Sequence, residues 1–160
     1  QGTVGRPHVA RVLHAHGYIA SPSEAFTKYI GPKNPGFVPG SPLPPVQVIR
    51  VIREAGGVPV LAHPVHSAAK GARAGVDSLR TIVSGMKEAG LVGMEVYYGD
   101  YSAEHVRALS ALADEFNLVP CGGSDYHALG DPGEILPGLV GPPEQSVTAL
   151  RSLRPRRAVG

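Results

Sequence analysis

Hydrophobic residues recur at helical spacing in the first third of the chain. Residues 6–16 begin with Pro7, a favoured early helix position, and carry apolar side chains at helical intervals before Gly17. Residues 21–30 begin with a potential capping serine, Ser21, followed by an early acidic residue. The pattern therefore predicts two short helices.

A second pattern, a helix followed by a short apolar strand, occurs three times. The helices are expected at residues 46–55, 79–89 and 102–116, and the strands at residues 58–62, 93–97 and 118–121. The stretch before them, residues 31–45, is rich in proline and glycine and predicts a loop. Short apolar strands joined by helices are typical of a parallel α/β sheet or barrel, in which the carboxyl ends of the strands carry the chemistry.

Composition narrows the class of protein. A length of 160 residues with 42% hydrophobic residues fits one soluble globular domain. The 15 Lys and Arg residues nearly balance 13 Asp and Glu residues, so the charge footprint of a dedicated nucleic-acid binder is absent. The sequence contains no run of about 18 apolar residues, which is the length needed to span a membrane. Cys121 is the single cysteine, which makes a reducing cytoplasm the default expectation.

Four polar residues stand at or near the predicted strand ends. Asp125 and His127 form an Asp-x-His pair that suits Mn, Fe or Zn, although Asp125 could instead cap a turn with His127 on the surface. His63 follows another apolar strand, as a metal ligand or as a buried, hydrogen-bonded histidine. Glu95 lies inside an apolar strand, where an unpaired carboxylate is costly, so it either pairs with a basic group or faces the site.

Other histidines and the cysteine fit ordinary structural roles. His14 and His16 resemble a His-x-His motif, but residues two apart on a helix point about 200° apart and cannot share a metal. His66 and His105 are expected to be solvated or locally hydrogen-bonded. Cys121 is expected to be a small buried hydrophobic residue.

The start of the first predicted helix offers an anion site. Arg6, His8 and Arg11 cluster there, where exposed backbone N–H groups and the helix dipole favour a phosphate. Further positive charges that could contribute are Lys28, Lys33 and Lys70. No Walker-type or Gly-x-Gly-x-x-Gly loop is present, which disfavours the common nucleotide-binding folds.

Five segments in order resemble the polymerase and histidinol phosphatase (PHP) family. They are RPHVA, AFTKYIG, IREAGGVPVLAHP, GMEVYY and PCGGSDYH, and the resemblance runs from Arg6 to about Pro137. Within that family, the chain most resembles the metal-dependent nucleoside-phosphate and RNA 5′-end phosphoesterases. The resemblance implies a distorted (β/α)7 barrel with an inserted helical subdomain. It also implies up to three divalent metal ions, Mn, Zn or Fe, held by His, Asp and Glu at the strand ends.

The resemblance assigns roles to individual residues. His63, Asp125 and His127 are the expected metal ligands, and Asp125 and His127 are also the expected catalytic residues. By the same resemblance, Arg6, His8, Arg11 and Lys28 are candidate contacts to the substrate phosphate. Glu95 and Ser124, which lie at or near the strand ends, are further candidate substrate contacts. Residues 1–40 are expected to be part of the inserted subdomain and its Pro/Gly-rich connection, and residues 41–160 the carboxyl-terminal part of the barrel.

The family's opening strand carries a His-x-His motif, followed by further Asp, His and Glu ligands. Nothing before Arg6 can supply these ligands, so the chain resembles the carboxyl-terminal portion of such an enzyme and is expected to be inactive alone. The strand edges of a partial barrel would favour self-association.

The leading hypothesis is metal-dependent hydrolysis of phosphate esters in nucleotides, such as nucleoside 3′,5′-bisphosphates, or in short RNA. The expected partner is a phosphorylated small molecule or a short oligonucleotide. No association with a membrane is expected. Two alternatives stay open: a small-molecule phosphatase of the histidinol-phosphatase type, and a catalytically incomplete PHP module with a scaffold role.

Overall fold

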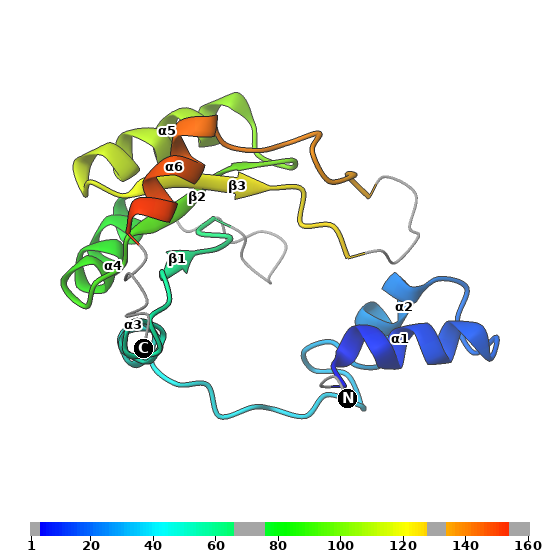
Figure 1. Cartoon of the computed structure of the whole chain (residues 1–160). Coiled ribbons are helices and arrows are strands. Elements are labelled where there is room, and N and C mark those ends of the chain that lie inside the picture. The colour runs from blue at the N-terminus through cyan, green and yellow to red at the C-terminus, as the bar shows by residue number, and fades with distance from the viewer. Residues whose placement is uncertain (1–3, 66–75, 128–133, 154–160) are drawn as a thin grey trace, which may run out of the picture. The chain divides into compact units, whose positions relative to one another are not determined.

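A computed structural model describes residues 4–65, 76–127 and 134–153. The chain divides into two compact units, which are considered separately (Figure 1). The helical unit contains the described residues 4–42, 126–127 and 134, and the sheet unit contains 43–65, 76–125 and 135–153. None of the helices in these ranges is long and apolar enough to cross a membrane.

The sheet unit is built on parallel strands. Its elements in chain order are α3 (Pro45–Glu54), β1 (Val60–Leu61), α4 (Val76–Glu88), β2 (Gly93–Tyr98), α5 (Ala103–Glu115), β3 (Val119–Gly123) and α6 (Glu144–Ser152). The described strands form one parallel sheet in the order β1-β2-β3, with α4 and α5 as the crossover helices. This confirms the three predicted helix-to-strand units.

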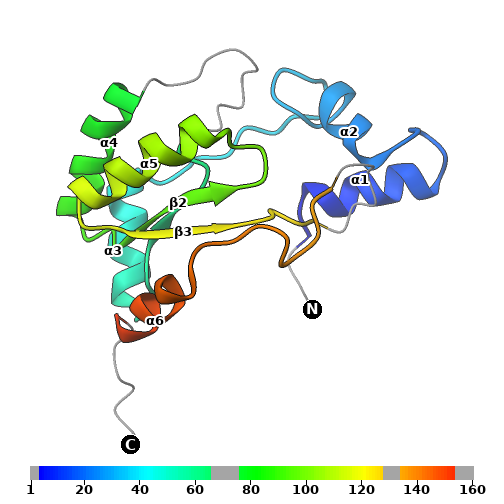
Figure 2. The ribbon, with the colours of Figure 1, turned by 90° about the horizontal axis from the view of Figure 1, so that it is seen from above.

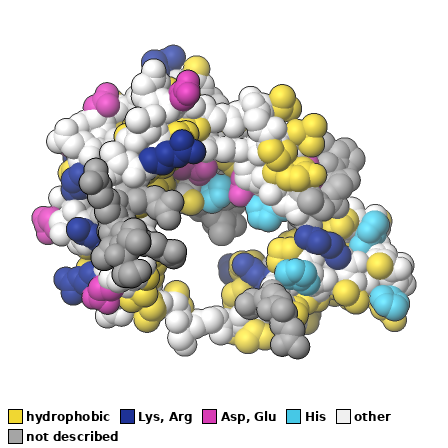
Figure 3. Space-filling view, in the orientation of Figure 1, with side chains coloured by type: hydrophobic (Ala, Val, Ile, Leu, Met, Phe, Trp, Pro, Cys, Tyr) yellow, Lys and Arg dark blue, Asp and Glu magenta, His cyan; other side chains and the backbone are white. Residues whose placement is uncertain are grey.

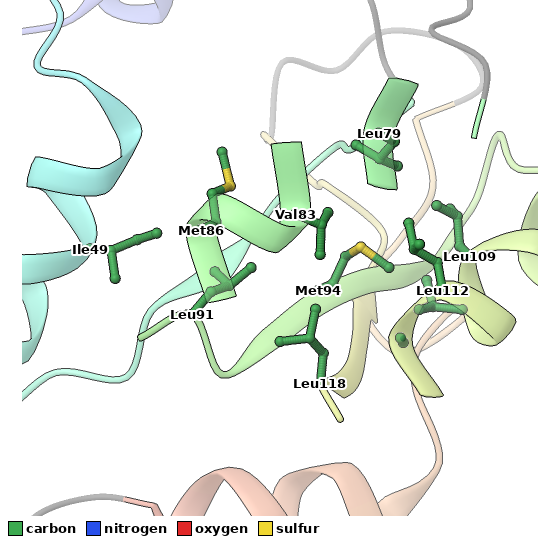
Figure 4. Packing of buried hydrophobic residues seen from close by; sticks show 11 residues of the cluster. Ile49, Leu79, Val83, Met86, Leu91, Met94, Leu109, Leu112 and Leu118 are labelled. Atoms are coloured by element: carbon green, nitrogen blue, oxygen red, sulfur yellow. The ribbon is translucent and has the colours of Figure 1, made fainter. Parts of the chain in front are cut away.

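Helices α4 and α5 lie side by side over one face of the sheet (Figure 2). The largest fully buried side chains come from both layers: Met94, Leu109, Leu112, Val83 and Val96. They form one cluster with neighbouring leucines and with Ile49 of α3 (Figure 4). Burying each such side chain contributes about 1.5–3 kcal/mol, so this layer holds the strands rigidly.

A β-bulge interrupts the pairing of β2 with β3. Glu95 pairs with Cys121 and Tyr97 with Gly122, so Val96 is the extra residue of β2. A Cβ atom at Gly122 would lie 2.0 Å from the backbone oxygen of Tyr97, so only glycine fits there. Bulges of this kind commonly redirect side chains beside active sites.

The bulge changes which side chains of β2 share a face. In a regular strand Glu95 and Tyr97 would point the same way. Here Tyr97 packs against the buried cluster of the sheet unit. Tyr98 instead joins Glu95 in contacting His63.

The helical unit consists of α1 (Arg6–Ala15) and α2 (Pro22–Lys28), which agree closely with the predicted helices. Its small core is Ala10, Ile19, Ala25 and Ile30. Ser21 holds the expected N-cap position of α2, but its Oγ lies 2.8 Å from Ser23 Oγ and does not cap the helix. The Glu24 carboxylate accepts the backbone N–H of Ala20 at 2.6 Å instead.

Several smaller expectations are also resolved. The strand expected at residues 58–62 is shorter, Val60–Leu61, and α6 was not predicted. Cys121 is buried as expected, and burial raises the pKa of its thiol. His105 is locally bonded, because its Nδ1 lies 3.1 Å from Ser102 Oγ and its backbone N–H donates to the same oxygen.

Candidate active site

His63 lies between two carboxylates at the carboxyl end of the sheet. Its backbone N–H donates to Oε2 of Glu95 at 2.8 Å, and its Nδ1 is 3.2 Å from the same oxygen. Its Nε2 is 3.6 Å from Oδ1 of Asp125. The imidazole of His63 therefore lies between the carboxylates of Glu95 and Asp125. Pairing of Glu95 with a basic group was one of the two alternatives that the sequence left open.

The backbone at the strand ends turns these side chains toward one another. His63 follows β1 with φ of 49°, and Asp125 follows β3 with φ of 53°. This left-handed conformation is uncommon outside glycine and costs about 1–3 kcal/mol, and such strain clusters at functional sites. Because β2 lies between β1 and β3, the two residues flank the strand that carries Glu95.

Exposure separates the roles of the three residues. The side chains of His63 and Asp125 are 32% and 36% exposed, whereas that of Glu95 is 12% exposed. The side chains of His63 and Asp125 are therefore more accessible to a ligand from solvent than that of Glu95, which contacts His63. The substrate contact expected for Glu95 stays a prediction.

Two tyrosines border the cluster. The Tyr98 ring meets the His63 ring edge-on, with centroids 5.0 Å apart and an interplanar angle of 85°. The Tyr101 ring packs on Tyr98 at 5.1 Å. Burial raises the pKa of Tyr101 to about 12. Burial, followed by the negative charges of Asp125, Asp100 and Glu95 and a hydrogen bond to Asp125, raises the pKa of Tyr98.

The donor set fits a divalent cation. Acidic and histidine side chains are exposed next to each other on the molecular surface (Figure 3). Two donors bound to one tetrahedral ion at metal–ligand distances of about 2.1 Å lie about 3.4 Å apart. The 3.6 Å between Nε2 of His63 and Oδ1 of Asp125 is close to that separation. A divalent ion would also offset the repulsion among the clustered carboxylates.

These donors are a partial ligand set. Within the described residues, no three His, Cys, Asp or Glu side chains are arranged to hold a metal ion. A catalytic zinc site takes three protein ligands, so His63 and Asp125 would need at least one more.

The last expected ligand, His127, belongs to the helical unit by its contacts. Its backbone N–H donates to Oε1 of Glu134 at 2.8 Å, and its side chain is exposed. Ser124 is half-buried directly before Asp125. The roles of His127 and Ser124 stay predictions.

The other expected substrate contacts lie on the helical unit and are exposed. His8 Nδ1 accepts the backbone N–H of Gly5 at 3.0 Å and so caps α1. Arg6 lines a concavity of about 560 Å³ with residues 37–42. Lys28 forms an ion pair with Glu24 one helical turn earlier. Arg11 is exposed on α1.

Two further histidines and a separate concavity lie apart from the cluster within the described residues. His14 lies in α1 and His16 is the C-cap residue of that helix. This helical placement is the one on which the His-x-His interpretation was rejected. His66 and Lys70 fall outside the described residues. A concavity of about 740 Å³ lies near the amino end of β3 and α6, and its lining contains Asp114 but no histidine.

Sequence reasoning did not single out Tyr98 as a site residue. Its position at the carboxyl end of β2 was a signal, because such ends carry chemistry in parallel α/β folds. The bulge that turns it toward His63 has no signature in the hydrophobic pattern.

No family model matches the chain. Curated relatives do: the chain is 31% identical over 162 residues to a 3′,5′-nucleoside bisphosphate phosphatase of Chromobacterium violaceum, covering 95% of the chain and 53% of that protein. It is 34% identical over 128 residues to the 5′-3′ exoribonuclease Rnm of Escherichia coli, covering 79% of the chain and 41% of the relative. The chain thus spans about half the length of the curated relatives it matches.

A solved structure shares the fold. It is a candidate metal-dependent phosphoesterase from Bifidobacterium adolescentis with a TM-score of 0.81 and 27% identity, over 95% of this chain and 51% of that protein. Similarity in sequence and in fold therefore leads to the same group of enzymes, and the partial coverage fits a carboxyl-terminal portion of one. In sequence and in fold the chain is thus similar to nucleotide and RNA phosphoesterases over about half of their length.

Proposed function

We propose that the protein to which this chain belongs is a metal-dependent phosphoesterase. Its substrates are phosphate esters of nucleotides, such as nucleoside 3′,5′-bisphosphates, or short RNA. The relatives named above act on these two substrate classes. The observation that carries the proposal is the placement of His63 between Glu95 and Asp125 at the carboxyl end of a parallel sheet.

In this proposal, His63, Asp125 and His127 hold divalent metal ions, with further ligands from other parts of the protein. When bound, the ions supply Lewis-acid activation of the phosphate ester. Glu95 holds the His63 ring so that Nε2 faces Asp125. Mn, Zn and Fe all suit this mixed nitrogen and oxygen donor set, and up to three ions are expected.

The helical unit is proposed to bind the phosphate groups of the substrate. Residues 6–33 of this unit contain Arg6, Arg11, Lys28 and Lys33, against a single acidic residue, Glu24. Positive charge on these two helices favours an anionic substrate there. Arg6, His8, Arg11 and Lys28 remain the proposed contacts, and Ser124 is the proposed contact beside the metal ligands.

The sheet unit is proposed to be part of a distorted (β/α)7 barrel. Residues 1–40 would belong to the inserted helical subdomain and residues 41–160 to the barrel. The outer strands of the described sheet, β1 and β3, would pair with further strands of the barrel, or with a second copy of the chain where those strands are missing. These 160 residues contain one cysteine, Cys121, which is buried, and this low cysteine content supports the cytoplasm as the proposed compartment.

Turnover of a nucleoside 3′,5′-bisphosphate by the full-length protein in Mn²⁺ tests the proposal. We expect Asp125→Asn to lower kcat by at least about a hundredfold, because it removes a negatively charged ligand. The variant should unfold at the same denaturant concentration as the wild type. Asp114→Asn, in an acidic residue outside the site, is the matched control and should keep wild-type turnover. Wild-type turnover by Asp125→Asn would contradict the assignment.

A substrate panel separates the proposed function from its alternatives. Preference for a 3′,5′-bisphosphate or a short RNA over histidinol phosphate supports the proposal, and the reverse preference supports a small-molecule phosphatase. Absence of turnover with every substrate would support a scaffold role.

A further inference from the structure

We propose that Tyr98 is a positioning residue that fixes His63 and Asp125 in the geometry for binding one metal ion. The proposal rests on the metal-dependent function proposed above. Tyr98 touches both candidate ligands, because its ring meets the His63 ring edge-on at 5.0 Å and its hydroxyl is hydrogen-bonded to Asp125.

The two ligands need such support because they sit on strained backbone. Both follow their strands in the left-handed conformation, with φ of 49° and 53°. Both side chains are about one-third exposed, so the buried cluster alone does not fix them. Glu95 orients His63 through two contacts. Tyr98 adds a contact that joins His63 to Asp125.

Tyr98 is itself held by contacts with Tyr101. The Tyr101 ring packs on it at 5.1 Å, and the backbone N–H of Tyr101 donates to the Tyr98 carbonyl at 3.0 Å. Tyr101 in turn packs against the buried cluster of the sheet unit. The rigid core therefore supports the two ligands through a short chain of aromatic rings.

The bulge in β2 is what gives Tyr98 this role. If β2 were a regular strand without the bulge, alternation would place Tyr97 on the side of Glu95 and turn Tyr98 away. Tyr97 packs against the core instead. The two adjacent tyrosines thus differ in surroundings, which makes Tyr97 a matched control.

The test compares Tyr98→Phe with Tyr97→Phe in the full-length protein. We expect Tyr98→Phe to raise the Kd for Mn²⁺, measured by electron paramagnetic resonance titration, about tenfold to a hundredfold. Tyr97→Phe should leave this Kd unchanged. The Tm of Tyr98→Phe should stay close to that of the wild type, because the ring and its packing remain. Excess Mn²⁺ should restore kcat in Tyr98→Phe, which a general structural defect would not allow.

A double-mutant cycle sharpens the result. If the Tyr98 hydroxyl acts through Asp125, Tyr98→Phe should add no further loss of Mn²⁺ affinity to Asp125→Asn. An unchanged Mn²⁺ Kd in Tyr98→Phe, with an active wild type, overturns the role of Tyr98 and leaves the proposed function standing. A wild-type protein that binds no metal overturns both.

Discussion

At the residue scale, His63 and Asp125 show which site residues can be found from their positions after apolar strands. Their places after apolar strands made both candidates for ligands, the resemblance to the PHP family predicted them as ligands, and the structure places Nε2 of His63 3.6 Å from Oδ1 of Asp125. The partner of Glu95 was left open by the sequence, because an acidic residue in an apolar strand indicates only that something compensates its charge. The compensating group is His63, which lies 32 residues away and is brought close by the pairing of β1 with β2.

Glu95→Ala tests the support given to His63. Removing the carboxylate leaves the backbone N–H of His63 without its acceptor, so we expect the free energy of unfolding to fall by about 1–3 kcal/mol. Affinity for Mn²⁺ should fall about tenfold to a hundredfold. Urea denaturation and metal titration of the full-length protein measure the two effects.

The control for this substitution is Glu88→Ala, at an exposed glutamate that ends α4. Glu88→Ala should change neither the free energy of unfolding nor the affinity for Mn²⁺ appreciably. Glu95→Gln keeps a hydrogen-bond acceptor and should restore most of the stability. Wild-type Mn²⁺ affinity in Glu95→Ala would rule out the orienting role.

At the element scale, periodicity predicted the helices and strands that carry strong apolar patterns. Helix α6 was missed because it is short and follows two prolines, with few apolar residues to mark a face. The bulge in β2 was also missed, since it arises from pairing with β3 and leaves the run GMEVYY looking like a regular strand. Tyr98 therefore could not be placed in the site by alternation.

Gly122→Ala tests the packing at this bulge. The added Cβ would lie 2.0 Å from the backbone oxygen of Tyr97, so β2 and β3 must move apart. We expect the free energy of unfolding to fall by about 1–3 kcal/mol in urea denaturation. The neighbouring Gly123→Ala is the control, because its Cβ would meet nothing within 4 Å. Equal stability of the two variants would show that the bulge tolerates a side chain.

At the scale of the whole molecule, the two units carry different parts of the proposed site. The sheet unit holds His63, Glu95 and Asp125, and the helical unit carries the proposed phosphate contacts of α1 and α2. Local motifs made the individual residues candidates, since each motif depends on residues close together in the chain. The complete ligand set could not be derived in this way, because it depends on side chains brought together from distant segments.

The central claim is that His63 and Asp125 bind a catalytic metal ion. Elemental analysis of the full-length protein after Mn²⁺ loading and gel filtration tests it most directly. We predict that His63→Ala and Asp125→Asn each lose at least one equivalent of metal relative to the wild type. His14→Ala, at an exposed histidine of the helical unit, should lose none. Metal content equal to wild type in both site variants would contradict the account.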